Sequence, residues 1–332
     1  MEEKGMEAEA DCIALASWMK EQYGSTMITA LKTVLPVKRK IKGQETRSCK
    51  LLLSGEEAKD LLQICVNKKQ TAKARLLQEL IRMGELPMPL ITGKLHISSQ
   101  TIRSLEKQGA LGIIVKSGYR NPVKINGETV DARMGDYGRK KELNAGQQQA
   151  ADGILRDFDL GKRDTCLIYG ITGSGKTEVY LAVIEGIIKR GRQAIVLIPE
   201  IALTYQTLLR FYVRFKDRVS VINSTLSQGE KYDQWERAKK GEIDVMIGPR
   251  SALFTPFPHL GAIIIDEEHE NTYKSESMPK YHARETAEKI AAMHDAVVVL
   301  GSATPSLEAY YRAKNGEYRM YELTQRRPGG ML

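Results

Sequence analysis

The segment that most limits what this chain can fold into is a glycine-rich loop, Gly170-Ile-Thr-Gly-Ser-Gly-Lys176-Thr177. It matches the phosphate-binding pattern G-x-x-x-x-G-K-[ST] at every defined position. An apolar run at 165–169 precedes the loop and an amphipathic run at 178–190 follows it, which predicts a strand, a loop and a helix. A glycine-rich loop alone is often only a flexible turn, whereas these flanks favour a phosphate cradle.

Each part of such a cradle has a physical task. Backbone N–H groups turn inward around the β-phosphate, and the N-terminus of the helix adds positive potential. Lys176 is placed to reach the β- and γ-phosphates, and the Thr177 hydroxyl to ligate Mg²⁺. The sequence therefore predicts a site for a nucleotide and Mg²⁺ with the loop residues Gly170, Ile171, Thr172, Gly173, Ser174, Gly175, Lys176 and Thr177.

Short apolar runs alternate with helix-like stretches through the second half of the chain. The predicted strands are Thr165–Tyr169, Gln193–Ile198, Asp244–Ile247, Ala262–Ile265 and Ala296–Leu300. Continuous apolar strands that alternate with helices indicate a parallel sheet covered on both faces. The predicted fold class of this half is therefore α/β.

Acidic residues follow one of these strands directly, in the sequence Asp266-Glu-Glu-His269. Ligands of open α/β sheets bind at the carboxyl ends of the strands. Asp266 is therefore expected to hold Mg²⁺ through water, and Glu267 to orient or deprotonate the attacking water, with Lys176 as the third catalytic residue. Alone, the segment is equally typical of a solvated acidic turn, but the P-loop upstream favours the catalytic interpretation.

The positive charge of the chain is unevenly distributed. The net charge is +9, of which residues 1–142 carry +8 and residues 143–332 carry +1. Such asymmetry favours a polyanionic partner for the front part, although solubility alone also produces it.

Several protein classes are disfavoured by the composition. No apolar stretch approaches the roughly 18–20 residues that span a bilayer, and the charged N-terminus lacks a secretory signal. The four cysteines, Cys12, Cys49, Cys65 and Cys166, are too scattered for a zinc site or a disulfide framework. We therefore expect a cytoplasmic protein with no membrane partner and no zinc in this chain.

In the front part we expect a charged helix at 1–24 and then a basic segment at 27–50 that is either a linker or a phosphate-contacting arm. Helices are expected further on, at 71–83, 89–95 and 98–108. An apolar run and a basic stretch, 116–120, follow. Three short helices before a β-wing indicate a winged helix-turn-helix. Its DNA contacts would be Arg103 and Lys107 on the third helix and Lys116 and Arg120 on the wing. Winged helices also serve as protein-interaction or spacer modules.

Several segments resemble superfamily 2 helicase motifs. Asp266 to His269 resembles the D-E-x-H box, 301–305 (Gly-Ser-Ala-Thr-Pro) the S-A-T motif, and 199–204 and 248–254 the strand-end motifs that contact DNA. The residues of these segments resemble those of the primosomal protein N′ (PriA) family of replication-restart DNA helicases. So do the runs Thr-Glu-Val-Tyr180 and Tyr281-His-Ala-Arg284. That resemblance covers nearly the whole chain.

The resemblance implies roles for further residues. Gln147 would read adenine, and Thr204 and Arg250 would contact DNA, with pairing to a nearby acid as the alternative for Arg250. The loop around Tyr273 would stack on a single-stranded base and couple DNA to the ATP site, unless its tyrosines are ordinary surface residues. The coupling residues would be His269, Tyr273, Lys274, Tyr281, Arg284 and Thr304.

The resemblance also implies an organisation and an activity. The expected parts are a tail of a 3′-end DNA-binding domain (1–45), a winged helix (46–125), a linker (126–142) and a RecA-like helicase lobe (143–332). Such proteins are ATP-dependent 3′→5′ helicases that act on forked and single-stranded DNA with primosome and single-strand-binding proteins. The resemblance therefore also implies association with the nucleoid.

This chain departs from the family pattern in lacking most of the first domain, the zinc-binding cysteines and the second lobe with its arginine finger. We therefore expect a fragment that binds ATP and DNA with weak turnover. The alternatives are a non-catalytic binding fragment and another superfamily 2 translocase.

Overall fold

The computed structural model describes residues 2–35, 44–88, 90–118 and 142–325. It divides the chain into two compact units, one formed by residues 1–40 and 121–332 and one by residues 41–120. Within the described residues, no helix is both long enough and apolar enough to cross a membrane.

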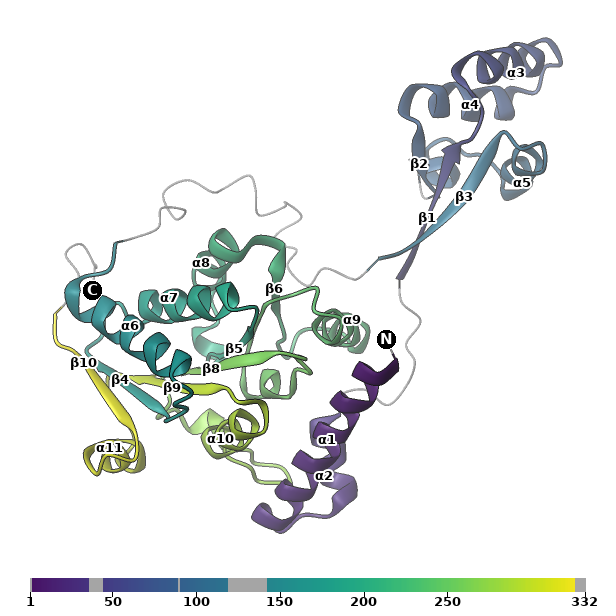
Figure 1. Cartoon of the computed structure of the whole chain (residues 1–332). Helices are drawn as coiled ribbons and strands as arrows, with labels where there is room; N and C mark the ends of the chain where they lie inside the picture. Colours follow the sequence, from purple (N-terminus) through teal and green to yellow (C-terminus); the bar gives the residue numbers. More distant parts are fainter. Residues whose placement is uncertain (1, 36–43, 89, 119–141, 326–332) are drawn as a thin grey trace. The chain divides into compact units, whose positions relative to one another are not determined.

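The larger unit is built on a seven-stranded sheet in which every neighbouring pair of strands is parallel. The strand order is β10-β4-β9-β8-β5-β7-β6 (Figure 1). The strands are β4 (Cys166–Gly170), β5 (Gln193–Leu197), β6 (Val219–Val221), β7 (Val245–Gly248), β8 (Leu260–Asp266), β9 (Val297–Ser302) and β10 (Arg319–Leu323). This is the predicted α/β class, a RecA-like lobe; the short strands β6 and β10 were not predicted.

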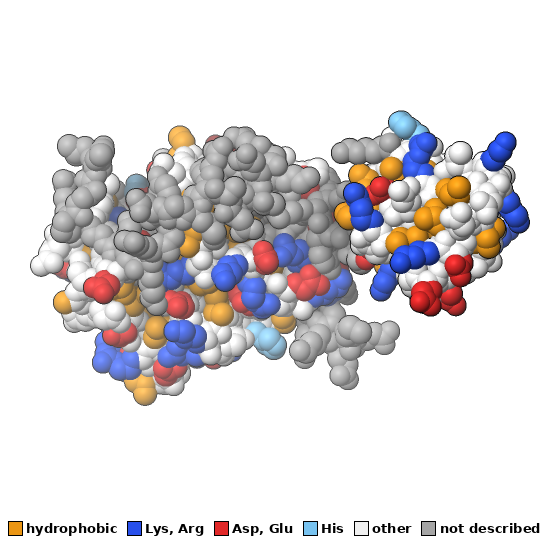
Figure 2. Space-filling view, turned by 90° about the horizontal axis from the view of Figure 1, so that it is seen from above, with side chains coloured by type: hydrophobic (Ala, Val, Ile, Leu, Met, Phe, Trp, Pro, Cys, Tyr) orange, Lys and Arg blue, Asp and Glu red, His pale blue; other side chains and the backbone are white. Residues whose placement is uncertain are grey.

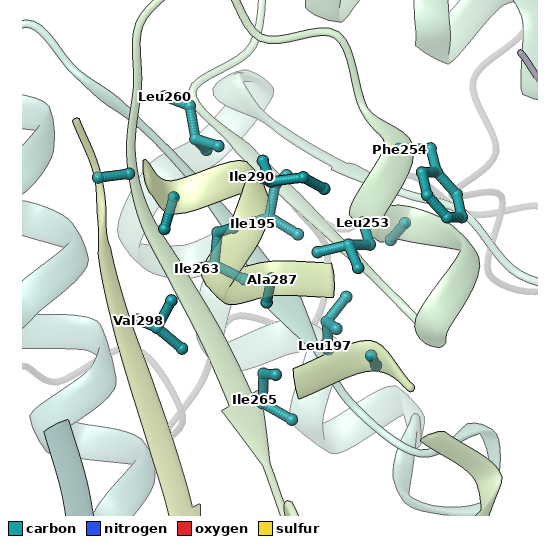
Figure 3. Close-up of a cluster of buried hydrophobic side chains, with 14 of the residues drawn as sticks. Ile195, Leu197, Leu253, Phe254, Leu260, Ile263, Ile265, Ala287, Ile290 and Val298 are labelled. Atoms are coloured by element: carbon teal, nitrogen blue, oxygen red, sulfur yellow. The ribbon is translucent and has the colours of Figure 1, made fainter. Parts of the chain in front are cut away.

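Helices cover both faces of this sheet, as expected for a parallel sheet. The helices of the lobe are α6 (Ala145–Asp159), α7 (Lys176–Lys189), α8 (Tyr205–Phe215), α9 (Gln228–Lys239), α10 (Ala283–His294) and α11 (Leu307–Lys314). Alternate residues of β8 enter different cores: Ile264 packs with α6, α7 and α8, whereas Ile263 packs on the side of α10. Figure 3 shows Ala287 and Ile290 of α10 over Ile263.

The first residues of the chain form a helical hairpin that belongs to this lobe. Its helices are α1 (Glu2–Tyr23) and α2 (Met27–Val34). Leu15 and Met19 are buried in the same core as Phe257 and Ile290, whereas Ile13 is 53% exposed. The structure thus groups residues 1–40 with the lobe rather than as the separate segment 1–45, because the hairpin buries its apolar side there.

The smaller unit combines three antiparallel strands with helices. Its strands, in the order β2-β1-β3, are β1 (Gln44–Leu51), β2 (Glu85–Pro87) and β3 (Leu111–Gly118), and its helices are α3 (Gly55–Asn67), α4 (Thr71–Met83), a π-helix (Leu90–Lys94) and α5 (Ser99–Lys107). Leu76, Leu77 and Leu80 of α4 pack against Ile102 and Leu105 of α5 in its core. The three helical segments and the last strand follow in the predicted order; α3, β1 and β2 were not predicted.

Candidate active site

The P-loop connects the end of β4 to the start of α7, so the predicted strand, loop and helix are all present. Gly173 and Gly175 both have a φ of +82°, a conformation that favours glycine. At Gly170, an added Cβ would lie 2.6 Å from the Ser174 hydroxyl oxygen. The loop is therefore closed tightly on itself, and it needs glycine for both its turns and its packing.

The Lys176 ammonium lies inside the loop and beside the acidic residues. Its Nζ donates to the Gly170 carbonyl at 2.9 Å and lies 3.8 Å from Glu267 Oε1. The side chain is only 8% exposed. A buried ammonium at the start of a helix is the charge that a nucleotide phosphate requires.

The Ser174 hydroxyl is a buried polar group without a hydrogen-bond partner among the described residues. Buried hydroxyls are normally satisfied, so an unpaired one within a phosphate-binding loop indicates that its partner comes with a ligand. This feature, together with the inward-facing loop and Lys176, fits the binding of a nucleotide phosphate.

Gln147 supports the P-loop from behind. It lies in the first turn of α6, where Asn144 and Gln147 form a capping box, and its Nε2 donates to the Ser174 carbonyl at 2.7 Å. The side chain is fully buried. Both ends of its amide bind the protein, so the structure does not place Gln147 on a surface that an adenine would meet. This differs from the role that the resemblance implies.

The acidic residues lie where β8 ends, next to the P-loop. The Tyr180 hydroxyl donates to Asp266 Oδ1 at 3.0 Å. Burial, and then the charge of Glu267, raise the pKa of Asp266 from 3.8 to about 6. Burial beside these carboxylates also raises the pKa of Tyr180 well above 10, so its phenol stays protonated as a donor. Glu267 has a φ of +47°, which turns the chain sharply after the strand.

The donor set of this region fits Mg²⁺ in the presence of a nucleotide. The described residues contain no group of three or more His, Cys, Asp or Glu side chains that could hold a metal by themselves. Mg²⁺ usually takes one or two carboxylates together with hydroxyl, water and phosphate oxygens. Asp266 and Thr177, the two ligands that the sequence predicts, carry oxygens of that type.

We expect the substitution Asp266→Asn to stabilise the fold at neutral pH. The raised pKa means that the folded protein binds this proton more tightly than the unfolded chain does. The stability contributed by this proton is complete below the unfolded pKa of 3.8 and is lost as the pH rises through about 6. One pKa unit corresponds to about 1.4 kcal/mol, so the asparagine variant should gain up to about 3 kcal/mol near neutral pH.

Urea unfolding of both proteins at about pH 7.5 and about pH 4 measures this difference, which should be small at the lower pH. A loss of stability in the asparagine variant near neutral pH would contradict the prediction.

A chain of side chains links the acidic box to the S-A-T segment. His269 Nδ1 lies 3.6 Å from Glu267 Oε2 and 2.7 Å from the Ser302 hydroxyl. The other ring nitrogen lies 3.4 Å from the Thr304 hydroxyl, and the Thr304 N–H donates to Ser302 Oγ. Because β8 and β9 are neighbours, these contacts join the two motifs at one edge of the sheet.

Glu268 is a functional candidate that sequence reasoning missed. It is 2% exposed, and Arg284 Nη1 lies 3.3 Å from its Oε2. The Ser306 N–H donates to its Oε1 at 2.6 Å, and Arg284 also donates to the Ser306 hydroxyl. A buried carboxylate needs such partners, and here they tie α10 and the start of α11 to the acidic box. The only sequence signal was the third acidic position of the box itself.

The tyrosines of the predicted aromatic loop are buried. Tyr273 is 1% exposed and Tyr281 is 4% exposed, and Tyr281 packs edge-on against Phe254 at 5.4 Å. The prediction that this loop offers a stacking surface for DNA bases is therefore wrong for these two rings. The Tyr273 hydroxyl lies instead within hydrogen-bond distance of the carbonyls of Leu197 (3.1 Å) and Asp266 (2.6 Å).

The remaining predicted residues are dispersed. Lys274 is exposed, and its Nζ lies 5.6 Å from the ring centroid of Tyr23. Thr204 caps α8 by accepting from the Thr207 N–H. Arg250 donates to the carbonyls of Thr272 and Lys274, and no acid among the described residues pairs with it.

In the smaller unit, Arg103 and Lys107 are exposed on α5. Figure 2 shows Lys and Arg side chains distributed around the visible face of this unit. The side chain of Lys116 and the whole of Arg120 lie outside the described residues.

Comparison with known proteins gives consistent matches. A family model described as "Type III restriction enzyme, res subunit" matches residues 140–307. The chain is 43% identical to replication restart protein PriA of Bacillus subtilis over 242 residues, which are 73% of this chain and 29% of that protein. It is 35% identical to PriA of Chlamydia trachomatis over 328 residues, 97% of this chain and 42% of that protein. Among solved structures, RecG bound to a three-way DNA junction matches with a TM-score of 0.44 and 23% identity, over 58% of this chain and 25% of that one.

Proposed function

Because this chain belongs to the family described as type III restriction enzyme, res subunit, and is homologous to PriA replication restart proteins, we propose that it is the first ATP-binding lobe of a DNA motor. Its sequence is that of a PriA-like superfamily 2 helicase region. The proposed activity is ATP hydrolysis coupled to 3′→5′ movement on single-stranded DNA, in the restart of replication and the assembly of a primosome.

The observation that carries this proposal is the path from the P-loop to the S-A-T segment. Lys176, Glu267, His269 and Thr304 follow one another at 3.8, 3.6 and 3.4 Å, with Ser302 bound to His269 at 2.7 Å. A static nucleotide-binding protein needs only the first two of these residues. A motor also needs contacts that extend to a neighbouring strand, because a change at the γ-phosphate must alter the structure away from the nucleotide.

The chemistry follows from the side chains present. The loop N–H groups and Lys176 bind the β- and γ-phosphates, while Asp266 and Thr177 would hold Mg²⁺, which neutralises phosphate charge when bound. Glu267 orients a water molecule for attack on the γ-phosphorus and accepts its proton. The bond from that phosphorus to the oxygen bridging the β- and γ-phosphates breaks, and ADP leaves with the electron pair.

Coupling to DNA is proposed to run through buried contacts rather than through base stacking. Tyr273 binds the backbone at the ends of both β5 and β8, so movement of either strand end would reach the other. Arg284 and Glu268 provide a second connection, from the acidic box to α11. Lys274 and Tyr281 lie between Tyr273 and Arg284, in the connection from the acidic box to α10.

The proposed DNA contacts are exposed or near the carboxyl edge of the sheet. Thr204 and Arg250 follow β5 and β7, and Arg103 and Lys107 lie on α5 of the smaller unit, with Lys116 and Arg120 beyond it in sequence. Cations that bind phosphates supply affinity without sequence preference. We propose forked and single-stranded DNA as the ligand, other primosome and single-strand-binding proteins as partners, and the bacterial cytoplasm as the location.

The purified 332-residue chain is expected to hydrolyse ATP slowly, with little response to DNA. It spans less than half the length of the curated relatives it matches, and the described residues contain one RecA-like sheet. An arginine finger from a second lobe contributes about 10³–10⁵ in turnover. Phosphate release with and without forked DNA, with a Glu267→Gln variant as the background, measures this.

Strong DNA-dependent turnover by the chain alone would contradict the expectation. Nucleotide and DNA binding with no turnover above that background would favour the second candidate function, a fragment that binds both ligands without hydrolysis. The partial coverage of its relatives is the observation that favours this candidate.

A further inference from the structure

A tyrosine on the P-loop helix makes direct contact with the carboxylate of the acidic box. Tyr180 lies one helical turn after Lys176 on α7 and is 1% exposed. Its hydroxyl lies 3.0 Å from Asp266 Oδ1 and donates to it. The helix that begins at the phosphate cradle therefore also holds one oxygen of the carboxylate assigned above to Mg²⁺.

The space for this phenol depends on a glycine in the neighbouring strand. Gly301 of β9 pairs directly with Asp266 of β8. A Cβ added at Gly301 would lie 1.5 Å from the Tyr180 hydroxyl oxygen and 2.6 Å from the ring carbon that carries it. Contacts under 3 Å of this kind do not occur, so the tyrosine and the glycine fit only as a pair.

The contact restricts the carboxylate more than burial alone would. A carboxylate at the end of a strand can rotate about its side-chain bonds, and each rotation presents a different oxygen to a ligand. A buried donor on a rigid helix selects one of these orientations. Tyr180 is almost completely buried, so packing holds its own position fixed in turn.

We propose that Tyr180 is a positioning residue for Asp266: its hydroxyl fixes the orientation of the carboxylate for Mg²⁺–nucleotide binding, and Gly301 reserves the space that the hydroxyl occupies. This inference rests on the proposed function. It adds a residue that acts through Asp266 and links the geometry of the metal site to the helix that carries the phosphate cradle.

The test is Tyr180→Phe, which keeps the ring and removes only the hydroxyl. Binding of a fluorescent ATP analogue to the full chain is measured in EDTA and across a Mg²⁺ titration. The affinity in EDTA should stay within about twofold of wild type, while the Mg²⁺ concentration for half-maximal effect should rise about tenfold, as for other outer-shell partners of metal ligands. A role in packing alone would leave that Mg²⁺ requirement unchanged, which would overturn the proposal.

Tyr318→Phe is the matched control. Tyr318 is also a buried tyrosine, but its hydroxyl donates to Glu288 on α10, so its loss should not change the Mg²⁺ requirement. An equal rise in both variants would overturn the proposal, since it would show a general effect of losing a buried hydroxyl. Wild-type binding with no Mg²⁺ dependence would overturn the proposed function as well, whereas a normal wild type and an unchanged Tyr180→Phe variant would overturn the positioning role alone.

Discussion

Replacing Lys176 by alanine will remove most of the affinity of this chain for ATP. The ammonium is buried in the loop, where the Gly170 carbonyl and Glu267 hold it in the position that a nucleotide phosphate would meet. Hydrogen bonds to charged groups contribute about 1.5–3 kcal/mol each, so the loss of phosphate contacts should weaken binding by about a hundredfold. Titration with a fluorescent ATP analogue in the presence of Mg²⁺ measures the change.

Lys189→Ala is the control for this substitution. Lys189 lies near the end of the same helix and is 71% exposed, and its Nζ lies 3.8 Å from Glu185 Oε1. Its loss removes the same charge from the chain and should leave the affinity within about twofold, since exposed ion pairs contribute little. Equal affinity of the wild type and the Lys176→Ala variant would refute the assignment of the P-loop as a nucleotide site.

Glu267→Gln is expected to separate binding from hydrolysis. The amide keeps the shape of the side chain but cannot accept the proton of the attacking water. General-base catalysis typically contributes about 10²–10⁴ in rate, and the hydrolysis step should slow by about that factor. Affinity for ATP should change by only a few-fold, because Lys176 and the loop still bind the phosphates.

Single-turnover phosphate release measures the hydrolysis step even where steady-state turnover is slow. Glu276→Gln provides the comparison, because Glu276 is an exposed carboxylate nine residues further along the same connection. If the Glu267→Gln variant retains a rate close to that of wild type, Glu267 is not the base, and another group must accept the proton.

Much of the lobe could be predicted from the sequence because its signals are local. The five predicted strands match β4, β5, β7, β8 and β9 to within two residues, since each is a continuous apolar run before a loop. By contrast, β6 has only three residues and β10 reads Arg-Met-Tyr-Glu-Leu. Both strands lie at the edges of the sheet, where one side needs no partner and the apolar signal is weaker.

The direction of single side chains could not be predicted in the same way. A tyrosine is equally suited to stacking on a base and to burial with its hydroxyl bonded. Tyr273 is buried because its hydroxyl reaches the Leu197 carbonyl, 76 residues away in sequence. Gln147 likewise turns toward the Ser174 carbonyl across 27 residues. Such distant partners are set by the fold, and nothing in the neighbouring sequence encodes them.

The hairpin of α1 and α2 affects the order in which the parts of the lobe fold during synthesis. Its apolar residues pack with strands and helices from the far end of the chain, and Tyr23 binds Glu285 across 262 positions. Ribosomes add about 5–20 residues per second, so the hairpin waits roughly 10–50 s for its partner surface to be synthesised. Until then Leu15, Met19 and Val34 face water or a chaperone, so the hairpin is made before the surface that buries it and is among the last parts of this lobe to reach its native contacts.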